Sequence, residues 1–266
     1  ERFGIAIAQE VRDVGAQMLL APGINIQRTP MCGRTFEYQT EDPYLNKDLA
    51  VAVVKGIQSQ RIAACVKHFI CNNQEINRFT VSSQVSERAL QEIYFPAFKA
   101  AVQEADAWSI MTSYNKINGT YGSEHKYLLR EVLIKEWGFR GFVVSDWTAT
   151  KFISRTESCI NAGLTLEMPM HNKYIPTKMK KAFDEGKFTE ERLNDNIKRL
   201  LRVMFLTGLF DDESTLPKGS RNTSEHQNLT REIAEEGIVL LENEGDLLPL
   251  DSEKLRRLQL LDQTRI

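Results

Sequence analysis

Hydrophobic and polar positions follow two alternating patterns along the first 210 residues, and together they predict helices separated by short strands. Apolar residues recur at helical spacing in five segments, which are 1–15, 43–60, 86–104, 123–137 and 189–207. Short, continuously apolar runs lie between them at 18–21, 62–69, 108–114, 142–146 and 164–168. Such runs are typical of strands that are buried on both faces, so the pattern favours a parallel sheet covered by helices.

Residues that start or stop helices support several of these boundaries. Asp42 and Pro43 form a favoured helix start, with the aspartate as N-cap and the proline at the first helical position. Thr189 is expected to cap the last of the five helices, and Gly138 to end the helix before it. Pro96 lies inside a predicted helix, where it should produce a kink.

A repeated strand–helix pattern favours a (β/α)₈ TIM-type barrel over a sandwich. Five strands are predicted rather than eight, so we expect a barrel that is truncated, with strands missing at its N-terminal side. We assign residues 1–210 to this barrel domain and the polar, turn-rich residues 211–223 to a linker. Residues 224–266 are expected to begin a second α/β domain, with a helix over 224–235 and a strand over 238–241.

Composition and charge exclude several classes of partner. Thirty-four basic residues nearly balance 36 acidic ones, so the sequence lacks the excess of positive charge that nucleic-acid binding needs. No run of about 18 apolar residues indicates a membrane span. The four cysteines and four histidines show no metal-binding spacing, so we expect no metal and no cofactor. Neither the compartment nor the oligomeric state is indicated.

Polar side chains with catalytic potential stand at the ends of three predicted strands. Asp146 and Trp147 follow the strand at 142–146, Lys67 and His68 lie at the end of the second strand, and Tyr114 ends the third. Because the carboxyl ends of parallel strands share one rim, these side chains should meet there. The long loop at 24–41 adds Arg34 as a further candidate.

Several longer motifs carry a resemblance to a known family. They are VKHF (66–69), NNQE (72–75), SERALQEIYFPAF (86–98), MTSYNKING (111–119), LLREVLIKEWGFRGFVVSDW (128–147) and AGLTLEMP (162–169). In this order they resemble glycoside hydrolase family 3, the β-glucosidase-type enzymes, and EEGIVLLENEGDLLPL (235–250) resembles the start of that family's second, α/β sandwich domain. The resemblance implies a hydrolase that acts on a β-linked oligosaccharide or glucoside.

The resemblance also implies roles for individual residues. It makes Asp146 the nucleophile that forms a covalent glycosyl-enzyme, and Trp147 an aromatic platform beside the scissile bond. The residues that would hold sugar hydroxyls are Arg34, Lys67, His68 and Tyr114. The family's acid/base glutamate is expected in the second domain, outside this chain.

Each candidate residue also has a structural explanation. Asp146 is compatible with a helix cap and Trp147 with a packing role. Arg34 is compatible with an ion pair to Glu37, Glu41 or Asp42, and Lys67 with an ion pair to a neighbouring acid. Tyr114 is compatible with an inward-facing layer of barrel side chains. We interpret Glu75 and Arg78 as a structural ion pair.

Two other functions fit the same pattern. Lys67 at a strand end of a barrel is also what a Schiff-base lyase would use. A chain without the acid/base domain is equally compatible with an inactive fragment that only binds sugar. A borohydride trap distinguishes the lyase, and an aryl β-glucoside assay distinguishes the fragment.

Overall fold

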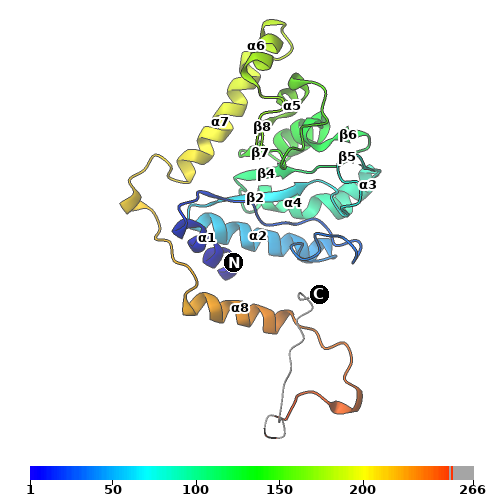
Figure 1. Cartoon of the computed structure of the whole chain (residues 1–266), viewed down its shortest axis with the longest axis vertical. Helices are drawn as coiled ribbons and strands as arrows, with labels where there is room; N and C mark the ends of the chain where they lie inside the picture. Colours follow the sequence, from blue (N-terminus) through cyan, green and yellow to red (C-terminus); the bar gives the residue numbers. More distant parts are fainter. Residues whose placement is uncertain (252, 254–266) are drawn as a thin grey trace. The chain divides into compact units, whose positions relative to one another are not determined.

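The computed structural model describes residues 1–251 and 253, which divide into two compact units. The first unit, Glu1–Thr223, contains the sheet and most of the helices, and the second begins at Ser224. The first is an α/β fold built on a parallel sheet, as the hydrophobic pattern predicted (Figure 1).

The main sheet has five parallel strands in the order β1-β2-β4-β7-β8. The strands are β1 (Met18–Leu19), β2 (Ala63–Phe69), β4 (Ser109–Thr112), β7 (Phe142–Val144) and β8 (Leu164–Leu166). All five predicted strands are therefore present, and each pairs with the next one in sequence. Hydrogen bonds among the described residues do not close the sheet, so β1 and β8 are its edges and a closed barrel is not observed.

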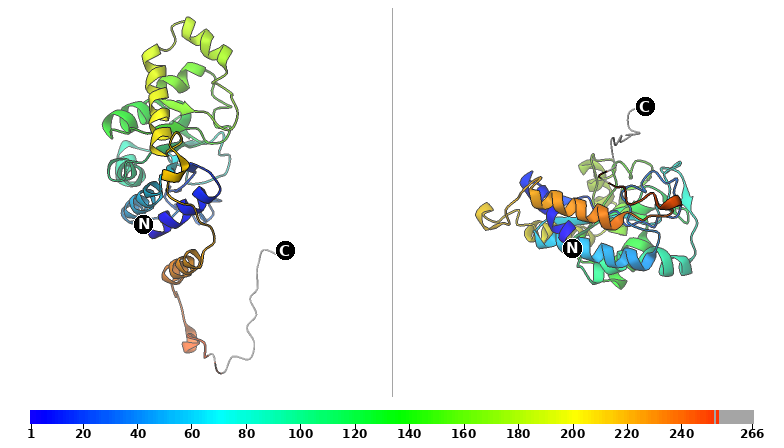
Figure 2. Two further views of the ribbon diagram at one scale, coloured as in Figure 1. Left: turned by 90° about the vertical axis from the view of Figure 1, so that its left-hand side faces the viewer. Right: turned by 90° about the horizontal axis from the view of Figure 1, so that it is seen from below.

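Helices pack on the sheet and on one another. They are α1 (Arg2–Asp13), α2 (Pro43–Ser59), α4 (Phe95–Gln103), α5 (Thr156–Ala162), α6 (Pro176–Asp184) and α7 (Glu190–Leu206). Helix α2 lies between α1 and α4, whereas α7 contacts β7 and β8 (Figures 1 and 2). The main core includes an aromatic cluster of Phe69, Phe95, Phe98 and Trp137. This core fixes β2, whose carboxyl end carries two of the candidate site residues.

The first residues of helices α2 and α7 are determined by local sequence. The Asp42 carboxylate accepts a 2.8 Å hydrogen bond from the Tyr44 amide, and Pro43 is the first residue of α2. Thr189 caps α7 by accepting a 3.2 Å bond from the Arg192 amide. These predicted caps are confirmed, because a short polar side chain can satisfy a free amide of the first helical turn.

Two of the predicted helices are not regular α-helices. The segment at 86–104 is divided into α3 (Glu87–Ala89), a π-helical turn η1 (Leu90–Tyr94) and α4. Pro96 lies in the first turn of α4, where a missing amide is tolerated, and the π-helical turn precedes it. The segment at 123–137 is a 3₁₀ turn η2 (Gly122–Glu124) followed by a π-helix η3 (Tyr127–Glu136). A small second sheet, with β3 (Ser82–Ser83), β5 (Lys116–Ile117) and β6 (Thr120–Tyr121), was not predicted.

Helix α7 packs on the core with Leu193, Leu200 and Val203. Ile197, which continues the same apolar spacing, is 45% exposed. Asn196 is buried instead, and its amide donates a 3.1 Å hydrogen bond to the Leu164 carbonyl. A polar residue therefore takes the inward position because it satisfies a carbonyl of β8.

The strand predicted over 238–241 is absent. The second unit contains α8 (Ser224–Gly237) and a short 3₁₀ turn η5 (Glu244–Asp246), and residues 238–241 are exposed and form no strand. Four apolar residues become a strand only beside a hydrogen-bonded neighbour, and the described residues provide none here. The preceding segment 211–223 contacts α1, where the Ser220 amide donates to the Gln9 carbonyl at 3.1 Å.

Candidate active site

Asp146 lies two residues after the end of β7, at the carboxyl end of the sheet, and is the most buried candidate acid. The residue is only 5% exposed to solvent. Oδ1 accepts a 2.7 Å hydrogen bond from the Trp147 amide, while Oδ2 is buried and accepts no hydrogen bond within the described part of the chain. The next helix, α5, begins only at Thr156, so Asp146 is not a helix cap. A buried carboxylate oxygen without a hydrogen-bond partner destabilises the fold. Its presence therefore indicates a functional role.

Three of the predicted site residues surround this carboxylate. His68 Nε2 lies 3.4 Å and Arg34 Nη2 lies 4.0 Å from Asp146 Oδ2. The Tyr114 hydroxyl faces the same carboxylate and interacts with it. The structure thus brings together residues from the ends of β2, β4 and β7 and from the loop before α2, as expected for a shared rim.

Arg34 connects the carboxylates of the site. Its guanidinium binds Glu37 at 2.6 Å through Nη1 and Glu75 at 3.0 Å through Nε. The third nitrogen, Nη2, is the one that faces Asp146. The ion pair with Glu37, one of the explanations considered for Arg34, is present, and the guanidinium also faces Asp146.

Lys67 joins the same network from β2. Its ammonium lies 2.9 Å from Glu37 Oε2, and its side chain is 16% exposed. The peptide bonds Lys67–His68 and Phe69–Ile70 are cis, which no sequence signal indicated. The ion pair with a carboxylate differs from the apolar or cationic surroundings that activate a Schiff-base lysine, so the lyase alternative loses support.

Three further residues of the site were missed or underestimated by sequence reasoning. Arg78 pairs with Glu75 at 2.6 Å, as interpreted, but its guanidinium also lies 4.5 Å from the centre of the Tyr114 ring. Tyr38 and Asn72 are buried beside His68, with Tyr38 Oη 3.0 Å from His68 Nδ1. The short acid–base spacing was a signal for Arg78, and Asn72 lies in the NNQE motif, whereas Tyr38 lies in an irregular loop without a signal.

Burial and charge shape the ionisation of the site. Burial raises the pKa of Asp146, and the Trp147 amide, the Tyr114 hydroxyl and the cations of the site oppose this rise. Burial lowers the pKa of His68 well below its usual value, and the positive charges of Arg34, Lys67 and Arg78 lower it further. His68 is therefore neutral at physiological pH.

Trp147 differs from the other candidates because it is open to solvent. The residue is 50% exposed, which argues against a role in core packing. A half-exposed indole next to a buried carboxylate offers a flat apolar surface to a ligand.

Among the described residues, no three His, Cys, Asp or Glu side chains are grouped so that they could hold a metal ion. All four cysteines are buried free thiols. The described helices include none that is long and apolar enough to cross a membrane.

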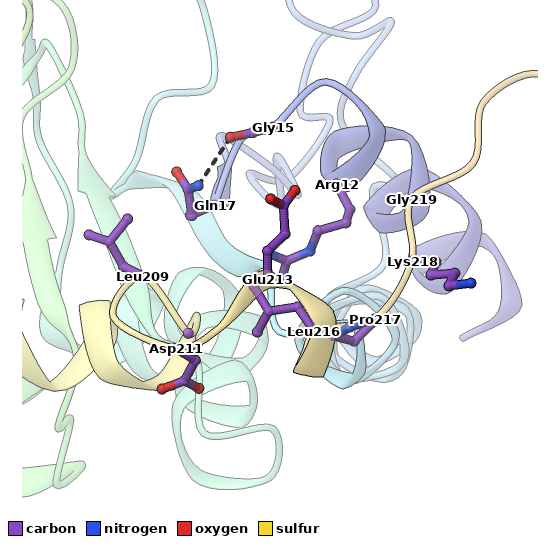
Figure 3. Close-up of a pocket in the computed structure, with 11 residues that line it drawn as sticks. Arg12, Gly15, Gln17, Leu209, Asp211, Glu213, Leu216, Pro217, Lys218 and Gly219 are labelled. Atoms are coloured by element: carbon purple, nitrogen blue, oxygen red, sulfur yellow. Dashed lines mark hydrogen bonds between the residues drawn. The ribbon is translucent and has the colours of Figure 1, made fainter.

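A separate pocket lies near the amino end of β1. This is the opposite end of the parallel sheet from Asp146. It is lined by the end of α1 and by residues 208–219 (Figure 3). Two of its charged groups already have partners: Arg12 donates to the carbonyls of Gln60 and Arg61, and Asp211 pairs with Arg61 at 2.6 Å. We interpret this pocket as a packing feature rather than as a binding site.

Polar side chains gathered around a buried carboxylate, with an exposed indole beside them, are typical of a carbohydrate-active hydrolase. Comparison with known families agrees, because the glycosyl hydrolase family 3 N terminal domain matches residues 1–203. The chain belongs to this family, and it is a β-glucosidase-like glycoside hydrolase domain.

Individual relatives are similar over nearly the whole chain. Thermostable beta-glucosidase B of Acetivibrio thermocellus is 46% identical over 94% of this chain and 32% of its own length. A beta-glucosidase of Rhizobium radiobacter is 44% identical over 94% of the chain and 30% of its own length. The structure of beta-glucosidase 3B from Thermotoga neapolitana in complex with glucose gives a TM-score of 0.84 at 42% identity, covering 94% of this chain and 35% of that one. The chain thus spans about a third of the length of these relatives.

Proposed function

We propose that this chain is the nucleophile-bearing part of a retaining β-glycosidase that releases glucose from β-glucosides, with Asp146 forming a covalent glycosyl-enzyme. The observation that carries the proposal is the state of Asp146 Oδ2, which is buried, lacks a hydrogen bond and lies at the carboxyl end of the sheet. Such an oxygen keeps a lone pair available for attack on the anomeric carbon.

The charges around Asp146 suit this role. Burial raises the pKa of the carboxylate, and the charges of Arg34 and Lys67 oppose this rise, while the Trp147 amide fixes the other oxygen. Charge on the nucleophile is consumed when the glycosyl–aspartate bond forms and is restored when water cleaves it. Preorganised cations at fixed positions need no reorganisation during either step.

Sugar binding is assigned to the polar groups of the same rim. We propose that Arg34, Lys67, His68 and Tyr114 hold the hydroxyls of the sugar and that Trp147 supports the group beyond the scissile bond. Convergent polar donors and one apolar face are what a pyranose ring requires. Two of these relatives carry the name beta-glucosidase, and one structure is a complex with glucose, which supports glucose as the sugar.

A retaining mechanism also needs a second carboxyl, about 5–5.5 Å from the first, as acid and then base. The two acids nearest to Arg34 do not suit this task, because Glu37 is paired with Arg34 and Lys67. Burial opposes ionisation of Glu75, but hydrogen bonds from Arg78 and Asn72 and the charge of Arg34 outweigh it and lower its pKa. A general acid must hold a proton at the working pH. We therefore propose that the acid/base glutamate belongs to a second domain, outside these 266 residues.

The architecture that we propose for the whole protein extends the observed parallel sheet. The five-stranded parallel sheet would be part of a (β/α)₈ barrel, and residues 224–266 would lead into an α/β sandwich domain. The position of Asp146 agrees with the rule that barrel enzymes place their catalytic groups at the carboxyl ends of strands.

The proposal is tested by replacing Asp146 in the full-length protein. Asp146→Ala is expected to reduce kcat on an aryl β-glucoside by roughly 10⁴–10⁶-fold with an unchanged thermal unfolding profile, because the covalent route is lost. Azide should restore part of the turnover and yield a glycosyl azide. Asp48→Ala, on the exposed face of α2, is the matched control and should retain full activity.

Three outcomes would contradict the proposal. Near-normal activity of the Asp146→Ala variant would remove Asp146 from the mechanism. A reduced adduct on Lys67 after borohydride treatment with a keto substrate would instead support the Schiff-base alternative. A folded protein that binds glucose without hydrolysing any β-glucoside would be a sugar-binding protein.

A further inference from the structure

A chain of buried hydrogen bonds runs from Glu75 to His68 and has a fixed direction. An ionised carboxylate can only accept hydrogen bonds, and Glu75 is held in that state by Arg34 and Arg78. Asn72 places an amide atom 3.0 Å from Glu75 Oε1. That atom must be the NH₂ nitrogen, because an amide oxygen there would face a carboxylate. The carboxylate therefore determines the orientation of the Asn72 amide.

The orientation of Asn72 in turn determines what the Tyr38 hydroxyl does. The same NH₂ group lies 3.1 Å from Tyr38 Oη, so the phenol oxygen accepts this bond. The phenol has one proton of its own, and the other polar atom placed against Tyr38 Oη in the described structure is His68 Nδ1, at 3.0 Å. Tyr38 thus donates to Nδ1, which must carry a lone pair. Burial raises the pKa of Tyr38, which keeps the phenol protonated.

A neutral imidazole has a single N–H, and an acceptor at Nδ1 leaves the proton on Nε2. We propose that Tyr38 is a positioning residue, which holds His68 in the Nε2–H tautomer and so keeps the proton on the ring nitrogen that lies 3.4 Å from Asp146 Oδ2. The opposite tautomer would direct a lone pair at the carboxylate. The direction of the proton is thereby set by Glu75, through Asn72 and Tyr38. The kinetic consequence rests on the proposed function, whereas the tautomer itself does not.

The backbone around His68 is built to hold this arrangement. The Asn25 side chain accepts from the His68 amide at 2.7 Å and donates to the His68 carbonyl at 2.9 Å. Gly23 forms bridges to both Tyr38 and Lys67, which brings the loop of Tyr38 alongside β2. A Cβ atom at Gly23 would lie 3.1 Å from the Tyr38 ring, so the glycine provides the room that the ring occupies.

The tautomer is measured directly by ¹⁵N NMR of the full-length protein labelled selectively at histidine. The signals of His68 are assigned by their loss in His68→Gln, or by elimination with His125→Gln, His171→Gln and His226→Gln. We expect an unprotonated Nδ1 and a protonated Nε2 in the unmodified protein near neutral pH. In Tyr38→Phe the Nδ1 loses its donor, and we expect a mixture of tautomers. A protonated Nδ1 in the unmodified protein, or an unchanged pure Nε2–H form in Tyr38→Phe, would overturn the proposal.

Kinetics provide the second measurement. Tyr38→Phe should lower kcat on an aryl β-glucoside about tenfold or more while KM changes little, because the donor aimed at Asp146 is misdirected. Tyr94→Phe is the matched control, since it removes another buried hydroxyl, which accepts a 2.6 Å bond from Arg28, outside this chain of contacts. Its kcat should stay unchanged. Equal losses in both variants would show that Tyr38 is only structural.

The tautomer and the proposed function fail independently of each other. If the full-length protein does not hydrolyse β-glucosides, the proposed function fails while the NMR result still decides the tautomer. If hydrolysis occurs and His68 carries its proton on Nδ1, the proposed function stands and the role of Tyr38 is wrong.

Discussion

At Asp146, burial and positive charge act on the pKa in opposite directions, and burial is the stronger. The pKa therefore lies above the ordinary value of about 3.9 for aspartate. The nucleophile works only when ionised, and a raised pKa means that its proton is retained to higher pH. We predict that kcat/KM of the full-length protein has its full value above this pKa. On acidification, kcat/KM should fall at a pH that is higher than the ordinary aspartate pKa.

Arg34 provides the check on this prediction. It is one of the cations that hold the pKa of Asp146 down, so Arg34→Gln should move the acid limb of the kcat/KM profile to still higher pH. His68 does not produce this limb, because its own pKa is far below the usual histidine value. An acid limb at or below the ordinary aspartate value, or one that Arg34→Gln leaves in place, would contradict this balance of burial and charge at Asp146.

The sequence identified part of this site at the level of single residues. Asp146, Lys67 and Tyr114 were predicted because the ends of parallel strands share one rim. Tyr38 was not predicted, because its hydrogen bond to His68 joins an irregular loop to a strand 30 positions further along the chain. Such contacts depend on tertiary packing and leave no periodic signal.

At the scale of elements, one buried carboxylate organises the loop that follows β8. The Glu167 side chain accepts from the Thr150 hydroxyl and from the backbone amides of residues 172–174. The next residue, Met168, is bonded through its backbone to Ser145 and Thr148, which flank Asp146. Glu167 therefore links this loop to the segment that carries Asp146.

We predict that Glu167→Gln lowers the free energy of unfolding by about 1.5–3 kcal/mol, because a neutral amide binds these donors less strongly and directs its own NH₂ at some of them. Denaturant unfolding measures the loss, and kcat on an aryl β-glucoside should also fall. Glu41→Gln, at an exposed position, serves as the control and should be close to neutral. Equal stability of the two variants would show that Glu167 does not organise the loop.

Elements differ in how far the sequence determines them. Helix α2 was predicted to its first residue because Asp42 and Pro43 act locally. The π-helices η1 and η3 were not predicted, since such turns arise from the fit of a helix to its surroundings. The apolar run at 238–241 failed as a strand because a strand depends on a neighbour that local sequence cannot specify.

At the scale of the molecule, the proposed function makes this chain one half of a two-carboxyl machinery. It covers about a third of its relatives, its parallel sheet is open at β1 and β8, and the acids around Arg34 are committed to ion pairs. The central claim is that Asp146 is the residue that becomes covalently bonded to the sugar.

Covalent labelling tests this claim most directly. The full-length protein is incubated with a 2-deoxy-2-fluoro-β-glucoside that carries a good leaving group, digested, and analysed by mass spectrometry. The fluorine slows hydrolysis of the glycosyl-enzyme, so the intermediate should accumulate. We predict a fluoroglucosyl adduct on the peptide that contains Asp146, and none in Asp146→Ala. An adduct on another carboxylate, or turnover of unfluorinated substrate without any adduct and with inversion at the anomeric carbon, would contradict the assignment of Asp146 as the nucleophile.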